Sequence, residues 1–251
     1  MLRIGHKGAD ALVPGNTVAS FEKAVEVGVD LIEFDVLWTE DGHPSIPAGK
    51  RSELVVAHDW HAAAAAGERG KRLTLEAALE AFARPPLDRV RINLDIKLPG
   101  RDYEVFDAVR RHRLIERTSV STMEISTVRK LGQLKREDEV ESGLSLGWTV
   151  PKVTKDWLGM PKFIRPALAM GLASVRVRMP GQVRRGLPEL EVDSIWAFFG
   201  VVTPRLVETI HDAGKKLYVW TVDDPKRIDS LIGLGVDGIC SNDPRLLNQV
   251  T

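Results

Sequence analysis

Short strand-like runs alternate with helical patterns along the whole chain, and this alternation limits the folds that the chain can adopt. Each run is rich in β-branched or alternating apolar residues, which is typical of strands. Strands that alternate with helices favour βαβ units and a parallel sheet covered by helices. We predict strands at Leu2–Gly5, Leu31–Leu37, Leu54–Ala57, Val90–Ile96, Thr118–Ser121, Gly143–Leu146, Ser174–Val177, Leu217–Val222 and Gly235–Cys240.

The segments between these runs carry helix signals at their ends. Helix N-caps are expected at threonine or aspartate, and glycine is expected near helix C-termini. These residues are Thr17, Thr74, Thr203, Asp223 or Asp224, Gly28, Gly214 and Gly235. The predicted helices are Val18–Val27, Leu75–Ala83, Tyr103–Arg111, Ile125–Lys135, Pro204–Ala213 and Pro225–Leu234.

The length of the chain indicates one domain. It has 251 residues, and a (β/α)₈ barrel typically needs about 250. We therefore predict an α/β fold, a (β/α)₈ TIM barrel that forms a single domain over residues 1–251.

Charge and cysteine content argue against several classes of protein. Lys+Arg and Asp+Glu both number 35, so the net charge gives no reason to expect nucleic acid or an anionic membrane as an obligatory partner. Cys240 is the single cysteine, which excludes an internal disulfide and a thiolate zinc site and fits a reducing compartment. With no visible signal peptide and no apolar run near the ~18 residues of a membrane span, we expect a cytoplasmic protein without a transmembrane segment. The oligomeric state is not predicted.

The stretch Trp157–Leu172 is apolar, and its two prolines are expected to break any long helix. We expect it to pack as buried helix and loop. The alternatives are a substrate lid or a lip that makes weak contact with lipid.

Two of the predicted strands place acidic residues on one face. Side chains alternate between faces along a strand, so Glu33 and Asp35 point the same way, and Asn93, Asp95 and Lys97 share one face of the run Ile92–Lys97. Buried carboxylates without compensation would cost several kcal/mol each. A divalent cation with oxygen ligands at the barrel mouth is the favoured explanation. The alternative is an internal salt bridge with Lys97 or Arg91.

Two histidines follow strand-like runs in equivalent positions. His6 comes after Leu2–Gly5, and His58 comes after Leu54–Ala57. Beside acidic strands, such a pair is typical of a general acid and a general base that work near neutral pH. The residues do not indicate which histidine has which role.

Several ordered motifs together resemble glycerophosphodiester phosphodiesterases over the whole chain. The motifs are His6-Lys7-Gly8, Asn16-Thr17, Gly28-Val29-Asp30-Leu31-Ile32-Glu33-Phe34-Asp35-Val36, Asp41-Gly42, His58-Asp59, Val219-Trp220-Thr221-Val222-Asp223 and Gly235-Val236-Asp237-Gly238-Ile239-Cys240-Ser241-Asn242-Asp243-Pro244. The resemblance implies a TIM-barrel enzyme that cleaves glycerophosphodiesters, small-molecule substrates, to glycerol 3-phosphate and an alcohol.

The resemblance also implies roles for individual residues. His6 and His58 would be the acid and base, and Glu33, Asp35 and Asp95 would hold one Mg²⁺ or Ca²⁺. Substrate contacts would come from Lys7 and Lys97 at the phosphate and from Trp220 at the pocket wall, where ordinary barrel packing is the alternative for Trp220.

The chain departs from the family pattern in four places. Lys7 replaces an arginine, Gly15 replaces a glutamate, and Asp95 replaces a glutamate. The connection to His58 carries an extra segment around Ser45–Glu53, expected to be a surface loop, whereas only Trp60–Leu73 stands where relatives often carry a small subdomain. We therefore expect no large inserted subdomain. The alternative functions are a lysophospholipase D type hydrolysis of lysolipids and a non-catalytic phosphate-binding barrel.

Overall fold

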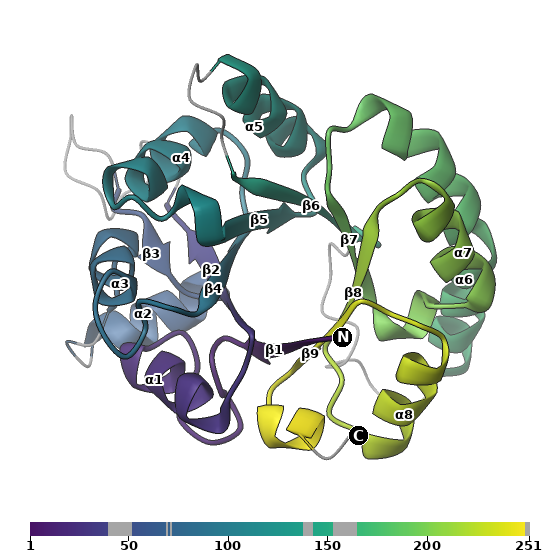
Figure 1. Cartoon of the computed structure of the whole chain (residues 1–251), viewed down its shortest axis with the longest axis horizontal. Coiled ribbons are helices and arrows are strands. Elements are labelled where there is room, and N and C mark those ends of the chain that lie inside the picture. Colours follow the sequence, from purple (N-terminus) through teal and green to yellow (C-terminus); the bar gives the residue numbers. More distant parts are fainter. Residues whose placement is uncertain (40–51, 69, 71, 138–142, 153–164, 249–251) are drawn as a thin grey trace.

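A closed barrel of parallel strands forms the centre of the molecule (Figure 1). The structure is a computed structural model and describes residues 1–39, 52–68, 70, 72–137, 143–152 and 165–248. Helices surround the strands on the outside, as the alternation in the sequence predicts. The TIM-barrel prediction is therefore confirmed. The barrel strands are β1 (Leu2–His6), β2 (Leu31–Leu37), β4 (Arg91–Ile96), β5 (Thr118–Thr122), β6 (Ser145–Val150), β7 (Ser194–Phe198), β8 (Lys216–Trp220) and β9 (Gly238–Ser241).

The barrel closes between its first and last strands. β1 pairs in parallel with β2 on one side and with β9 on the other, and Gly5 lies opposite Ile32 and Ser241 in the two ladders. The short strand β3 (Val55–Val56) stands apart from the ring because it pairs antiparallel with the end of β2. Parallel strands aim their carboxyl ends at one rim, which is where the active sites of such barrels form.

Eight α-helices connect or flank the strands in the described part of the chain. Thr17, Thr74 and Thr203 cap helices as predicted, and of the two candidate aspartates Asp224 is the one that caps. Helix α2 takes up most of the short segment Trp60–Leu73, which leaves no room there for a large inserted subdomain. The helices are α1 (Val18–Val27), α2 (Trp60–Glu68), α3 (Leu75–Phe82), α4 (Asp102–Arg111), α5 (Ile125–Glu137), α6 (Arg165–Gly186), α7 (Pro204–Asp212) and α8 (Pro225–Gly233).

Alternation along β2 separates the core from the site. Ile32, Phe34 and Val36 point outward into the main hydrophobic core, where helices α1 and α3 cover them. The Phe34 ring lies 5.3 Å from that of Phe21 and 5.5 Å from that of Phe82, and all three rings are fully buried. This packing fixes the strand so that its opposite face presents Glu33 and Asp35 to the barrel interior.

One strand prediction in the C-terminal half is wrong, and one barrel strand there was not predicted. The run Ser174–Val177 alternates like a strand but lies inside helix α6. Residues on this helix pack against the core at every fourth position, at Val175, Met179 and Val183, whereas Val177 is 79% exposed. The barrel strand that was not predicted is β7, an apolar run that is buried without clear alternation. Periodicity alone cannot distinguish such a run from a buried helix.

The apolar stretch Trp157–Leu172 is described only in part. Residues 157–164, like most of the extra segment at Ser45–Glu53, lie outside the described residues. Helix α6 takes up the remainder and begins at Arg165, with a proline in its first turn, where the missing N–H removes no helical hydrogen bond.

Candidate active site

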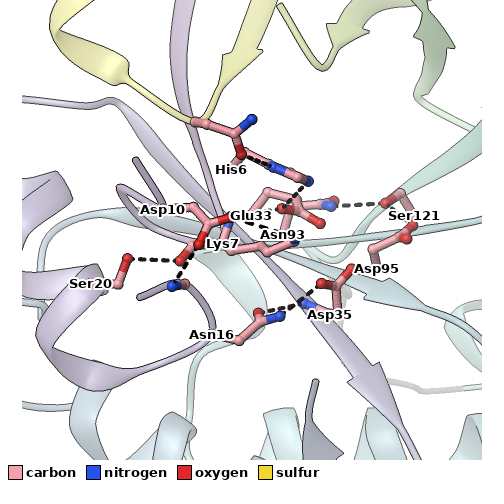
Figure 2. A network of polar contacts seen from close by, with 12 residues as sticks. His6, Lys7, Asp10, Asn16, Ser20, Glu33, Asp35, Asn93, Asp95 and Ser121 are labelled. Carbon is pink, nitrogen blue, oxygen red and sulfur yellow. Dashed lines mark hydrogen bonds and ion pairs between the residues drawn. The ribbon is translucent and has the colours of Figure 1, made fainter. Parts of the chain in front are cut away.

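Three buried carboxylates meet inside the barrel near its carboxyl-end rim (Figure 2). Glu33 and Asp35 come from β2 and Asp95 comes from β4, and the ladder between these strands places Asp35 directly opposite Asp95. One carboxylate oxygen from each residue lies within 4.8 Å of the other two. Twice a Ca²⁺–oxygen distance of about 2.3–2.6 Å spans such a separation, so these oxygens could hold a metal ion.

Lys97 provides the nearest positive charge. Its Nζ lies 2.6 Å from Asp35 Oδ1 and 2.5 Å from Asp95 Oδ2. Burial alone would raise the pKa of Asp35, but the charges of Lys97, His58 and His6 outweigh burial and hold that pKa below its usual range. Burial likewise opposes the charge of Lys97, yet the carboxylates raise its pKa. The salt bridge that the sequence left as an alternative is present with Lys97, while Arg91 is exposed at the other end of β4.

Glu33 is the carboxyl group with the least compensation. Burial raises its pKa well above the usual range, and the neighbouring charges of Asp35 and Asp95 add to the effect. The backbone N–H of Lys7 donates to Glu33 Oε2 at 3.1 Å, and Lys7 adopts a φ of 51° at this position. A left-handed backbone is uncommon for lysine. A further cation beside Glu33 would therefore relieve a cost that Lys97 does not remove.

Neutral side chains hold the two aspartates in place. Asn16 Nδ2 donates to Asp35 Oδ2 at 2.8 Å, and Ser121 Oγ donates to Asp95 Oδ1 at 2.8 Å. Asn93 Nδ2 in turn donates to Ser121 Oγ at 2.8 Å. These contacts use one oxygen of each aspartate, and the other oxygen of each faces Lys97.

His6 ends β1 and stands beside the carboxylates. Its Nε2 lies 3.9 Å from Glu33 Oε2, and its Nδ1 lies 2.6 Å from Asn242 Oδ1. Burial lowers the pKa of His6, although the charge of Asp35 and the hydrogen bond with Asn242 act in the opposite direction. A neutral imidazole with one nitrogen directed toward the acids can accept a proton.

Asn242 was assigned no role from the sequence, although it follows β9 directly. The position immediately after a barrel strand is the signal that singled out His6, and the same criterion identifies this amide. Asp223 lies after β8 and accepts a hydrogen bond from Asn242 Nδ2 at 2.6 Å. The sequence had considered this aspartate only as a helix cap.

His58 is placed differently from His6. It follows β3, which is not a barrel strand, so the predicted equivalence of the two positions is wrong. Its side chain is 53% exposed, and its Nδ1 lies 3.2 Å from Asp59 Oδ2. Asp59 Oδ1 accepts from the N–H of Ala62 at the start of α2, which fixes this carboxylate. The antiparallel pairing brings His58 to the Asp35 end of β2, since the N–H of Ala57 donates to Asp35 O at 3.2 Å.

A carboxylate from Asp10 fills the space beside Gly15. A Cβ at Gly15 would lie 2.5 Å from Asp10 Oδ1 and 2.7 Å from Lys7 Cβ. The N–H of Gly15 donates to that oxygen at 2.7 Å, and Lys7 Nζ lies 3.6 Å from Asp10 Oδ2. The Asp10 carboxylate thus lies beside position 15 and pairs with Lys7.

Trp220 ends β8, on the far side of the barrel from β4. Its Nε1 donates to the carbonyl oxygen of Trp196 at 3.1 Å, and its ring lies 5.6 Å from the ring of Phe198. The side chain is half-buried, which leaves part of the ring accessible at the mouth.

Within the described residues, no helix has the length and apolar character needed to cross a membrane.

Comparison with known proteins identifies the same family that the motifs resemble. A sequence model of the glycerophosphoryl diester phosphodiesterase family matches residues 6–81 and 165–246. A glycerophosphodiester phosphodiesterase of Caldanaerobacter subterraneus subsp. tengcongensis is 28% identical over 274 residues, which cover 98% of this chain and 96% of the relative.

Solved structures share the fold. A glycerophosphodiester phosphodiesterase from Parabacteroides distasonis superposes with a TM-score of 0.69 at 21% identity, covering 98% of this chain and 94% of the other. A phosphodiesterase of Oleispira antarctica, in complex with the product sn-glycerol-3-phosphate, gives a TM-score of 0.65 at 17% identity with coverage of 98% and 94%. The family match covers more than half of the chain and agrees with the barrel and with the motifs. The prediction of a phosphoric diester hydrolase is confirmed, and the chain belongs to the glycerophosphoryl diester phosphodiesterase family.

Proposed function

We propose that this protein hydrolyses glycerophosphodiesters to glycerol 3-phosphate and an alcohol, and that residues 1–251 act as one catalytic domain. The observation that carries the proposal is the cluster of Glu33, Asp35 and Asp95, three buried carboxylates of which Asp35 and Asp95 pair with Lys97. We assign these residues to one divalent cation, Mg²⁺ or Ca²⁺. When bound, such a cation supplies positive charge to the phosphoryl oxygens of the diester.

Two lysines and two histidines perform the remaining tasks in this proposal. Lys7 and Lys97 neutralise the phosphate as it gains negative charge. One histidine removes the proton of the attacking hydroxyl, and the other gives a proton to the departing alkoxide. His6 suits these tasks because its Nε2 lies 3.9 Å from Glu33 Oε2, and His58 because it follows Ala57, whose N–H donates to the carbonyl oxygen of Asp35.

A second candidate is hydrolysis of a lysolipid diester at the same site. The observation in its favour is an aromatic group at the mouth, where Phe198 contacts both Trp220 and Phe199, and all three are half-buried. An acyl chain could bury apolar area against these rings. The glycerol-type substrate is preferred because its recognition needs only the polar groups of the site.

The test is release of glycerol 3-phosphate from glycerophosphocholine and glycerophosphoethanolamine, with Mg²⁺, Ca²⁺ or a chelator. We expect cation-dependent release that falls by about two to four orders of magnitude in His6→Ala and in His58→Ala, the range of general acid–base catalysis. His112→Gln is the matched control, because His112 pairs with Glu76 outside the site. Release from neither diester with either cation would contradict the proposed substrate. Cleavage of lysophosphatidylcholine in the same assay would then favour the second candidate.

A further inference from the structure

The hydrogen bonds around Asn242 fix the orientation of its side-chain amide. Asn242 Nδ2 lies 2.6 Å from Asp223 Oδ2. A carboxylate accepts hydrogen bonds and does not donate them, so the nitrogen of the amide must face Asp223. The other carboxylate oxygen, Asp223 Oδ1, accepts from the backbone N–H of Asn242 at 2.8 Å and from Ser241 Oγ at 2.8 Å. Donors therefore approach both carboxylate oxygens.

The amide orientation decides which nitrogen of His6 carries a proton. Asn242 Oδ1 faces His6 Nδ1 at 2.6 Å, and an oxygen without a hydrogen can only accept. Nδ1 must then be the donor, and in the neutral ring the lone pair is left on Nε2. This nitrogen is the one on the side of the carboxylates, 3.9 Å from Glu33 Oε2.

The barrel itself holds the three residues in register. His6 ends β1, and Asn242 follows β9, its neighbour in the closed sheet. The loop that carries Asp223 is tied to β9, because the N–H of Val222 donates to the carbonyl oxygen of Cys240 at 2.9 Å. The arrangement differs from that of His58, whose Nδ1 faces the carboxylate of Asp59 and not an amide.

We propose that Asp223 and Asn242 are positioning residues that hold His6 in the Nδ1–H tautomer, so that Nε2 is the general base that takes the proton of the attacking hydroxyl. This role rests on the proposed function, whereas the tautomer does not. The O–H bond of the nucleophile breaks as the new bond to phosphorus forms, its proton moves to Nε2, and His58 supplies the proton to the departing alkoxide. Asp223 acts only through Asn242.

The experiment is two-bond ¹H–¹⁵N NMR on the full chain with ¹⁵N-labelled histidine, in the presence of chelator. For wild type we expect Nδ1 of His6 to be protonated and Nε2 to be unprotonated in the neutral ring. Asn242→Leu keeps the size of the side chain but removes the acceptor, so the Nε2–H tautomer should appear. Asp224→Asn is the matched control, because Asp224 caps α8 and has no contact with His6. It should leave the tautomer unchanged.

Exchange of the two residues provides a rescue. In Asp223→Asn with Asn242→Asp, the new carboxylate at position 242 accepts from His6 Nδ1–H and from the new amide at position 223. The hydrogen bonds that link positions 6, 242 and 223 are therefore kept. With glycerophosphocholine we expect kcat to fall about 10–100-fold in Asn242→Leu with little change in KM, and to recover in the exchanged pair.

Each outcome separates the tautomer from the reaction. An Nε2–H tautomer in wild type, or an unchanged tautomer in Asn242→Leu with the His58 resonances in place to show a folded protein, overturns the proposal. A tautomer that shifts in Asn242→Leu and returns in the exchanged pair supports the positioning role. This holds even if no glycerophosphodiester is cleaved, because that result would contradict only the proposed substrate. A normal kcat in Asn242→Leu despite a shifted tautomer would remove the general-base assignment.

Discussion

Replacement of Lys97 by methionine tests how the acidic cluster is balanced. Methionine keeps much of the length of the side chain but removes the ammonium that lies 2.6 Å from Asp35 Oδ1 and 2.5 Å from Asp95 Oδ2. Removal of one partner from a buried ion pair costs about 3–5 kcal/mol, because the remaining charges stay buried without compensation. For a chain of this length each kcal/mol lowers Tm by about 2–4 °C, so Tm in chelator at pH 7 should fall by about 6–20 °C.

The same replacement should strengthen cation binding. The ammonium of Lys97 and a divalent cation would use the same oxygens of Asp35 and Asp95, and their positive charges repel each other. Without the ammonium we expect Kd for Ca²⁺ or Mg²⁺ to decrease by at least about tenfold, or about 1.4 kcal/mol. A saturating cation should therefore raise Tm more in Lys97→Met than in wild type.

Calorimetric titration of the cation and thermal unfolding with and without chelator measure both effects. Lys135→Met is a suitable control, since Lys135 pairs with Asp193 away from the acidic cluster. A Tm within about 2 °C of wild type in chelator would refute the stability argument. A weaker or unchanged affinity for both cations would refute the idea that lysine and cation compete for the same oxygens.

Three further predictions follow from other contacts. Gly15→Ala should lower the free energy of unfolding by more than about 1 kcal/mol, because its Cβ would lie 2.5 Å from Asp10 Oδ1 and 2.7 Å from Lys7 Cβ. In urea unfolding the added change Asp10→Ala should restore only part of the loss, since the contact with Lys7 Cβ remains. Equal stability of the single variant would contradict the close contacts. Phe34→Ala should cost about 3–5 kcal/mol in the same assay, since it leaves a cavity between Phe21 and Phe82, and a loss below about 1 kcal/mol would show that the core collapses around it. Burial lowers the pKa of His6, so the folded state disfavours the charged ring. In chelator, the stability gained from the neutral ring is fully present above the unfolded pKa of about 6.5. It is lost as the pH falls through the lower folded pKa. The difference in unfolding free energy between wild type and His6→Gln should therefore shift against wild type below about pH 6.5, and a difference that does not vary with pH would refute this reasoning.

The sequence predicts the fold best where one face of an element is polar. Glu33 and Asp35 of β2 alternate with Ile32, Phe34 and Val36, so the inward direction of the two acids follows from the period of a strand. Apolar segments carry less information. In β7, Trp196 and Ala197 point to opposite faces and both are buried, so neither face is marked as polar. The alternation at Ser174–Val177 occurs by chance on a helix. Helix and strand cannot be told apart there by period alone.

The site divides in a similar way. Acidic residues on strands are conspicuous because buried charge needs a reason, and the contact of Lys97 with Asp35 and Asp95 joins residues close together on neighbouring strands. The contact between His6 and Asn242 joins residues that are 236 positions apart, and only closure of the barrel brings them together. The run Leu54–Ala57 predicts a strand before His58, but its apolar residues do not reveal that β3 pairs antiparallel with β2.

Pairing of β1 with β9 means that the site is complete only when the last strand of the barrel is in place. The three carboxylates belong to β2 and β4, whereas His6 obtains its amide from a strand that the ribosome releases near the end of synthesis. Synthesis proceeds from the N-terminus, so β2 and β4 leave the ribosome before β9. A nascent chain therefore contains Glu33, Asp35 and Asp95 long before Asn242 is present to orient the imidazole of His6. Cation binding would need the ligands of β2 and β4, whereas turnover would also need β9 and the closed barrel.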